Sequence, residues 1–495
     1  MDSIKKRYVF SLIVNILLCV PRVLAASFIP KGLGPAAYGD YQFLINNFTV
    51  IKNFLDFGSS TAFFTYNAKN EEASTLNIQY LLWWLFQLVL ITLLVFLTYL
   101  TGNYINIWPG QNFENIALAS ICVWLFLFAQ QLVQFGDSKG LTVLCQKVNL
   151  FANYVAALIL VLAYYKGVLT IKTAMIIYIA APVLIIFFLM VKFFARYFAT
   201  SLPILSGFSK NYDFFKKFCV PLFTVTIAGF LAEFLDRWML QKFAGSTASG
   251  YYSLSYNWAA ISLLFFNPML NIFWREVSQL AAGGKKEKIG QLFTKFAKLL
   301  FFITAFISIF LAFNAKDVLL LVAGKKFEGA TVAFIVMIFY PLIQVCGQLT
   351  GSIYLATERI KLYGFVAILT MIINIIASYF VLAPPNFLIP GFGFGADAYS
   401  LKIFATNLIG TEILIYLMGK KHDVNYGELL FHRCVILIAL SSGCFVSMLI
   451  FSGTNLIFLT IVKFLFYTVC AISFFWAFRL WFDLPDLKNL FFRSF

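Results

Sequence analysis

The sequence predicts an all-α integral membrane protein with two similar six-helix lobes followed by two further helices. The chain is 61% hydrophobic and 12% charged, with a mean hydropathy of +0.87. Apolar runs recur along its whole length, and each can cross roughly 30 Å of hydrocarbon. Because hydrocarbon offers backbone groups no partner, such runs form helices. A short repeated motif indicates that the chain consists of two related halves.

About 14 apolar runs are predicted to span the membrane, on the length that a helix needs to cross it. In chain order they cover residues 8–29, 38–64, 77–100, 114–135, 141–165, 171–194, 216–241, 247–275, 291–314, 327–356, 361–383, 394–419, 431–452 and 455–479. The first run follows Lys5, Lys6 and Arg7, as a signal peptide would. Arg22 inside that run, and the matching seventh run, favour a retained membrane helix.

The repeat joins the segment 33–41 to the segment 244–252. At one constant offset, Gly34 matches Gly245, Gly39 matches Gly250 and Tyr41 matches Tyr252. The basic pair Lys5–Lys6 matches Lys216–Lys217 at the same offset. Membrane chains built from two repeats commonly place their substrate site at the repeat interface, so this pattern favours a transporter.

The repeat predicts the domain organisation. We expect an N-terminal six-helix lobe over 1–200, a cytoplasmic linker over 201–215 and a second six-helix lobe over 216–420. Residues 421–495 then hold two additional helices and a short tail. Both lobes begin on the same side, so they are parallel repeats.

The net charge of +16 reflects membrane topology rather than a nucleic-acid surface. If the N-terminus is cytoplasmic, most Lys and Arg fall on the inner side. The outer side then holds Lys31, Lys166, Lys172, Lys242, Lys316, Lys325 and Lys326. This bias predicts a multi-pass protein of the bacterial cytoplasmic (inner) membrane with both termini in the cytoplasm, and no nucleic-acid partner.

Signals for an enzyme or a bound cofactor are absent from the sequence. It contains no GxxxxGK[ST], HExxH or GxSxG pattern, and its only histidines are His422 and His432. Its eight cysteines show no CxxC spacing. We therefore expect no catalytic residues, no metal site and no cofactor, and leave coupling to H⁺ or Na⁺ open.

Five cations fall inside predicted spans, where a charge costs about 2.5–3.5 kcal/mol on insertion scales. We predict that they face a lumen and contact an anionic substrate. They are Arg22, Lys52, Arg237, Lys402 and Lys463. An alternative stays open for four of them: Lys52 and Arg237 have acids four residues away, while Lys402 and Lys463 lie near the outer interface and can extend toward water. Arg22 has no local acidic partner, which favours a functional role.

Four acids share this depth and are candidate ion-coupling carboxylates, because burial raises the pKa of a carboxyl group toward neutral pH. They are Asp56, Glu233, Asp236 and Glu412. Asn374, Gln344 and Gln348 are interpreted as hydrogen-bonding residues between helices.

The motifs resemble those of bacterial polysaccharide flippases of the O-antigen (Wzx) type. The resemblance rests on Leu33–Tyr41 followed by Asp56–Ser60, on Asp236–Leu240 with Gly250–Ser253, and on Leu355–Lys361 with the turn 389–396. These segments cover most of the first 420 residues. Where the family usually has Gly-Ala-Ala after this last turn, the chain has Gly395–Ala396–Asp397.

The resemblance implies the two-lobed, alternating-access architecture of the multidrug/oligosaccharidyl-lipid/polysaccharide (MOP) superfamily, which also holds the MATE transporters. It implies a cationic lumen and an oligosaccharide on a polyprenyl pyrophosphate, moved to the outer leaflet for O-antigen or capsule assembly. The partners it suggests are membrane lipids and, at the assembly stage, a polysaccharide polymerase with its chain-length machinery. Alternatives are a cation-coupled multidrug exporter of the same superfamily and a flippase for murein or teichoic-acid precursors. A membrane glycosyltransferase or polymerase fits less well, because the predicted outer loops are short.

Overall fold

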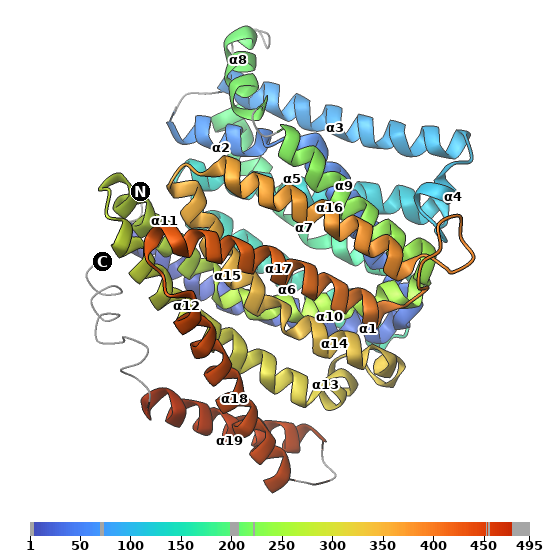
Figure 1. Cartoon of the computed structure of the whole chain (residues 1–495). Coiled ribbons are helices and arrows are strands. Elements are labelled where there is room, and N and C mark those ends of the chain that lie inside the picture. Colours follow the sequence, from blue (N-terminus) through green and yellow to red (C-terminus); the bar gives the residue numbers. More distant parts are fainter. Residues whose placement is uncertain are drawn as a thin grey trace. The chain divides into compact units, whose positions relative to one another are not determined.

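The computed structural model describes residues 4–69, 74–198, 207–220, 223–451, 453 and 456–477. Throughout these ranges the regular structure is helical, which confirms the predicted fold class (Figure 1). The chain packs as two compact units, Met1–Gly250 and Tyr251–Phe495. This division follows packing, and the lobe boundaries that the repeat suggests stay a prediction.

The first unit begins with a long helical stretch that is interrupted twice. Its helices are α1 (Ile4–Asp56), α2 (Ser59–Lys69), α3 (Ser74–Leu100), α4 (Tyr104–Ile107), α5 (Phe113–Ser138), α6 (Thr142–Tyr165), α7 (Ile171–Phe193), α8 (Phe208–Cys219) and α9 (Phe223–Met239). The π-helical turns η1 (Phe194–Phe198) and η3 (Leu240–Ala244) extend α7 and α9. After η3, α10 (Gly245–Ile261) begins in this unit and continues into the second.

The repeated glycines share one backbone conformation. Gly34, inside α1, has φ 75° and ψ 173°. Gly245, the residue at which α10 begins, has φ 82° and ψ 177°. This region of φ/ψ space is essentially restricted to glycine. The match therefore shows that the sequence repeat is a repeat of structure: a helix breaks at the glycine, and a new helical segment follows it.

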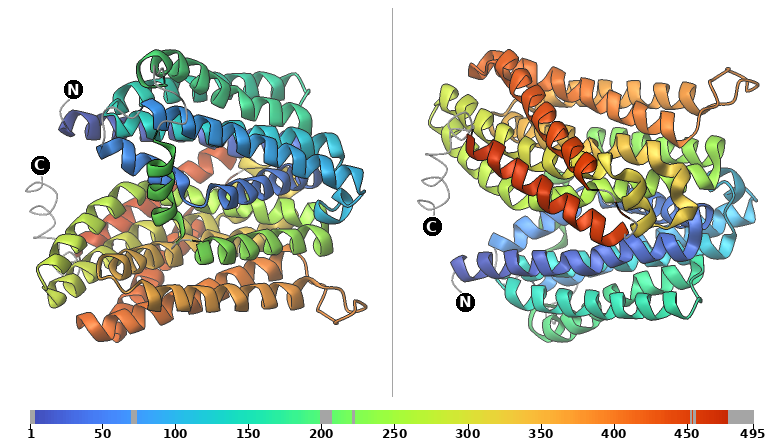
Figure 2. Two further views of the ribbon diagram at one scale, coloured as in Figure 1. Left: turned by 90° about the horizontal axis from the view of Figure 1, so that it is seen from above. Right: turned by 90° about the horizontal axis from the view of Figure 1, so that it is seen from below.

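A bundle of long helices forms the body of the first unit. α1 packs against α5, α6 and α9, and α5 and α6 both pack against α7. In the right view of Figure 2 the blue helix α1 runs alongside the turquoise helices of this unit. Aromatic side chains fasten α3 to α5, where the rings of Trp84 and Phe128 are 5.2 Å apart and Trp124 Nε1 donates to the Trp84 carbonyl oxygen at 3.1 Å. The short helix α8 instead crosses the end of α3 (Figure 1).

The second unit continues from α10 with a further set of helices. They are α11 (Asn267–Ala282), α12 (Lys286–Phe313), α13 (Ala315–Val322), α14 (Thr331–Ile338), α15 (Tyr340–Ala356), α16 (Ile360–Leu382), α17 (Ala396–His422), α18 (Tyr426–Ile450) and α19 (Leu456–Ala477). The 3₁₀ turns η4 (Ser262–Phe265) and η5 (Lys325–Ala330) precede α11 and α14.

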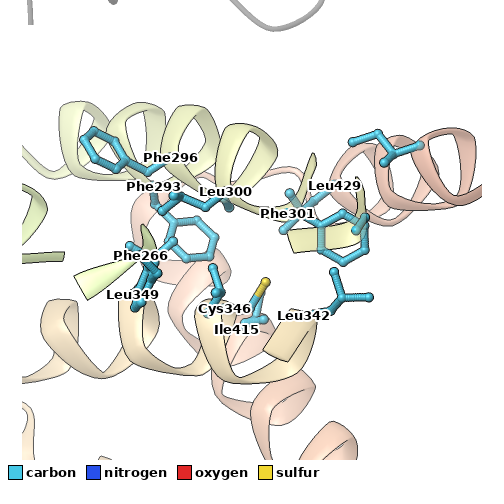
Figure 3. Close-up of a cluster of buried hydrophobic side chains, with 14 of the residues drawn as sticks. Phe266, Phe293, Phe296, Leu300, Phe301, Leu342, Cys346, Leu349, Ile415 and Leu429 are labelled. Carbon is cyan, nitrogen blue, oxygen red and sulfur yellow. The ribbon is translucent and has the colours of Figure 1, made fainter. Parts of the chain in front are cut away.

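The core of the second unit is rich in phenylalanine. Phe293, Phe296 and Phe301 on α12 meet Leu349 of α15 and Ile415 of α17 (Figure 3). Burial of each such side chain contributes about 1.5–3 kcal/mol on the water-transfer scale. The rings of Phe306 and Tyr467 stack at 4.8 Å and join α12 to α19. The last two predicted spans are thus anchored to the same core through α12.

Eleven helices of the described residues are long and apolar enough to span a membrane. This establishes a multi-pass membrane protein but does not confirm the count of fourteen. Part of the difference lies in α1, which holds the first predicted span and most of the second in one helix. Another part lies in the seventh and eighth predicted spans, where α9 and α10 have 17 residues each and are separated by a π turn and a break at Gly245.

Candidate functional site

The second predicted span breaks at a turn between α1 and α2. Phe57 has φ 47° and Gly58 has φ 79°, so two consecutive residues are left-handed. The Asp56 carboxylate caps the helix that follows: Oδ1 accepts from Ser59 Oγ at 3.0 Å, and Oδ2 accepts from Ser60 N at 3.3 Å and Ser60 Oγ at 2.7 Å. A carboxylate at a helix N-terminus satisfies otherwise unpaired N–H groups. The segment Asp56–Ser60 therefore interrupts a spanning helix and supplies the groups that stabilise the interruption.

Lys52 lies one turn before this break and is buried. Its side chain is 2% exposed, its Nζ is 3.9 Å from Asp56 Oδ1, and it lies 4.2 Å from the centroid of the Trp84 ring. An ammonium group over an indole face gains a cation–π attraction that grows when water is excluded. Asp56 and Trp84 together compensate the charge of Lys52. Broken spanning helices commonly form the substrate and ion sites of transporters.

The remaining charged residues predicted in the first unit lie on α1 and α9, which pack against each other. Arg22 on α1 and Glu233 on α9 are exposed, Arg237 is half-buried and Asp236 is buried. Asn15 and Asn53 on α1 are also exposed. A charge that faces hydrocarbon is costly, so the exposed Arg22 within the spanning helix α1 indicates a surface that is in contact with water.

A polar cluster centred on the half-buried Asp40 was not predicted from the sequence. Asp40 Oδ1 accepts from Gln111 Nε2 at 2.5 Å, from Gln241 Nε2 at 2.9 Å and from Ser246 Oγ at 2.6 Å. These donors come from the segment before α5, from η3 and from α10. One oxygen thus links three elements to α1. The repeat was the one sequence signal that could have pointed to this cluster. Asp40 and Ser246 each directly follow a glycine of the repeat, Gly39 and Gly245.

We expect Asp40→Ala to destabilise the protein by about 1–3 kcal/mol, because it removes the acceptor shared by the buried amides of Gln111 and Gln241 and by the Ser246 hydroxyl. Asp40→Asn keeps an acceptor oxygen and should cost less. Thermal unfolding of the purified protein in detergent measures both. Asp213→Ala, at an exposed carboxylate on α8, is the control; an Asp40→Ala midpoint equal to that of the control would contradict a stabilising role for the cluster.

In the second unit Lys402 is buried among neutral acceptors. Its Nζ donates to Asn374 Oδ1 at 3.1 Å and to Ser378 Oγ, and it lies 4.5 Å from the Tyr399 ring centroid. Thr406 Oγ1 shares the Asn374 acceptor at 3.1 Å. Asn374 thus hydrogen-bonds between α16 and α17.

Glu412 and Lys463 each have an ionic partner. Glu412 Oε1 accepts from Arg433 Nη1 at 2.5 Å, and its Oε2 accepts from Tyr426 Oη at 3.0 Å. Lys463 Nζ on α19 is 3.9 Å from Asp317 Oδ2 on α13. The structure therefore brings Lys52 to Asp56 and places Arg22, Glu233, Asp236 and Arg237 on two contacting helices. Lys402, Glu412 and Lys463 lie in three separate clusters of the second unit.

A multi-pass helical chain with an internal repeat, interrupted spanning helices and charges within the spans has the organisation of a secondary transporter. Residues 8–273 match the family described as "Polysaccharide biosynthesis protein", and the chain belongs to this family.

Solved structures share the fold. The chain is similar to "Lipid II flippase MurJ, inward closed conformation", with a TM-score of 0.66 and 14% identity over 95% of this chain and 99% of that one. It is also similar to an inward-facing MATE-family multidrug resistance transporter of the MOP superfamily, with a TM-score of 0.64 and 14% identity over 84% of this chain and 98% of that one. A MOP superfamily transporter from Pyrococcus furiosus gives a TM-score of 0.52 at 14% identity, covering 83% and 95% of the two chains. No curated protein matches the sequence. The fold is thus that of MOP transporters, as the sequence predicted.

Proposed function

We propose that the protein is a flippase that moves a polyprenyl-pyrophosphate-linked oligosaccharide from the cytoplasmic to the outer leaflet, for assembly of a cell-surface polysaccharide such as O-antigen or capsule. Membership in the polysaccharide biosynthesis family and the MOP transporter fold support the class of substrate and the transport step. We place the protein in a bacterial inner membrane with both termini in the cytoplasm, on the distribution of Lys and Arg. A polysaccharide polymerase and its chain-length machinery are the proposed partners.

The observation that carries this proposal is the presence of two arginines on helices of the first unit, Arg22 before the break of α1 at Gly34 and Arg237 near the end of α9. Arg22 on α1 is exposed within a spanning helix, and Arg237 lies half-buried on α9. Guanidinium groups bind phosphate through charge-assisted, often bidentate hydrogen bonds, which strengthen in a site of low dielectric. We assign the pyrophosphate to Arg22 and Arg237. Lys52, Lys402 and Lys463 remain proposed anion contacts, and each has to exchange its present partners for the substrate.

Among the four candidate coupling carboxylates, Glu233 is exposed on α9. It lies four residues from Arg237, so a proton or sodium ion that it binds would act directly on the charge of a proposed substrate contact. Asp56 caps α2, and Glu412 is paired with Arg433. We therefore propose Glu233 first for H⁺ or Na⁺ coupling, with Asp236 beside it.

Leaflet exchange of a labelled polyprenyl-pyrophosphate oligosaccharide in proteoliposomes tests the proposal. We expect Arg22→Ala and Arg237→Ala each to slow exchange at least tenfold, which corresponds to about 1.4 kcal/mol. Arg22→Lys should retain more activity than Arg22→Ala, because it keeps the charge.

Lys166→Ala, at an exposed lysine after α6, is the matched control for loss of a cation and should exchange at the wild-type rate. Wild-type rates in both arginine variants would refute the assigned anion site. Absence of exchange together with proton-driven efflux of a lipophilic cation dye would instead support a multidrug exporter. Exchange of a murein or teichoic-acid precursor alone would move the proposal to that class of substrate.

A further inference from the structure

The first unit holds a cavity of about 440 Å³ beside the break between α1 and α2. Its walls come from this break, from α3 and from the crossing helix α8. Aromatic side chains form most of its surface: Phe57, Tyr80, Trp83, Phe208, Tyr212 and Phe215. The volume lies in the range of ligand sites, which are mostly apolar with a few polar groups. From this cavity we infer a binding site for one hydrocarbon or isoprenoid chain of a phosphate-bearing lipid.

The sequence of α8 explains its position. Phe208, Tyr212, Phe215 and Cys219 recur at helical spacing and form one apolar stripe, and all four line the cavity. With 12 residues α8 is too short to span a membrane, and it crosses the end of α3 (Figure 1). An amphipathic helix with lysines on its polar face is typical of a helix that lies in the membrane interface.

Contacts with α2 and α3 hold α8 beside the cavity. Asn211 Nδ2 donates to Gln79 Oε1 at 2.8 Å, and the rings of Tyr80 and Phe215 stack at 5.9 Å. A further ring contact joins Tyr66 to Phe214 at 5.2 Å. Although Phe208 and Tyr212 line the cavity, they are 52% and 55% exposed. α8 is therefore fixed at one side, while two of its cavity-lining rings still have surface to bury.

The chemistry of the walls and of the rim selects the occupant. Aromatic walls favour an apolar chain, and chains of this kind surround the protein in a membrane. Lys216 lines the cavity and is exposed, with Lys210 and Lys217 on the same helix and Asp213 as the opposing charge. A basic rim favours a phosphate headgroup, because lysines near a membrane surface attract its negative charge. Asp56 also lines the cavity. Its carboxylate oxygens already accept hydrogen bonds from Ser59 and Ser60, so part of its negative charge is compensated within the protein.

The thiol of Cys219 in the cavity wall allows a direct test. We would replace Cys19, Cys434 and Cys470 by serine in the full chain and keep the four buried cysteines, so that Cys219 is the reactive thiol. In detergent, added phosphatidylglycerol or polyprenyl phosphate should slow maleimide labelling of Cys219 at least fivefold. Diacylglycerol with the same chains should slow it less, because it lacks the phosphate.

Two variants and one matched control decide the result. Lys216→Ala should weaken protection by the phosphate lipids toward that of diacylglycerol. Phe208→Glu, which places a carboxylate on an exposed wall residue, should weaken protection by all of them. The control keeps the exposed Cys434 in place of Cys219 and should label at a rate independent of lipid.

Equal protection of Cys434 and Cys219, unchanged protection in Phe208→Glu, or no protection by any lipid would overturn the inference. So would protection by a free oligosaccharide without a lipid chain. Protection by polyprenyl phosphate alone identifies the carrier lipid as the source of the chain, whereas protection by both lipids identifies phosphate lipids in general. The readout is independent of transport, so failure of the proposed flippase activity would not change it.

Discussion

Replacing Gly39 by alanine is expected to destabilise the protein by about 3 kcal/mol, at the upper end for an overpacked interior. A Cβ atom at Gly39 would overlap the carbonyl oxygen of Ser246 and would lie 2.7 Å from the backbone nitrogen of Gly250. These neighbours are backbone atoms of α10, which cannot change rotamer to make room. The expected result is a lower thermal unfolding midpoint and a lower yield of folded protein in detergent.

The repeat makes a second, reciprocal prediction. Gly250 corresponds to Gly39, and a Cβ there would overlap the carbonyl oxygen of Pro35, the residue that corresponds to Ser246. Gly250→Ala should therefore cost about as much as Gly39→Ala. The two substitutions act on one contact, so the double variant should cost less than their sum.

Gly229→Ala on α9 is the matched control, because a Cβ there meets no atom within 4 Å. Alanine is the better helix former by about 1 kcal/mol, so this variant should be as stable as wild type or more so. Equal midpoints for Gly39→Ala and Gly229→Ala would contradict the close approach of α1 and α10.

The sequence predicted the features that depend on local pattern. Apolar runs of spanning length predicted the helices, and the offset between Gly34 and Gly245 predicted a repeat that the backbone angles confirm. Spacing of four residues also predicted that Lys52 and Asp56 lie together on one helix. These predictions hold because helix formation in a membrane depends on each segment's own composition.

Features that depend on contacts between distant segments were not predicted. Gln111 and Gln241 have no pattern that points to Asp40, and the partner of Arg433 lies on another helix. The segment 216–241 was predicted as one span, because its apolar content does not show where a helix changes direction. The structure instead ends α8 at Cys219 and begins α9 at Phe223.

Arg433→Ala is expected to cost about 3–5 kcal/mol, because it leaves a carboxylate uncompensated in a largely buried position. The side chains of Arg433 and Glu412 are 9% and 21% exposed, and their ion pair joins α18 to α17. The guanidinium also lies 5.6 Å from the Phe301 ring centroid on α12, so its loss removes packing as well as charge. Thermal unfolding in detergent, followed by aromatic circular dichroism, measures the effect.

A double variant separates the cost of an unpaired charge from the value of the pair. Replacing Arg433 and Glu412 together by leucine should recover most of the stability, because apolar groups of similar volume often replace a buried ion pair at little cost. Glu114→Ala gives the contrast: Glu114 and its partner Lys172 are 72% and 59% exposed, so loss of this ion pair should change the stability little. If Arg433→Ala costs no more than Glu114→Ala, the ion pair does not hold α18 to α17. Glu412 would then be free to act in ion coupling alongside Glu233. A large loss of stability in Arg433→Ala that the double leucine variant restores would instead show that Glu412 stabilises the fold.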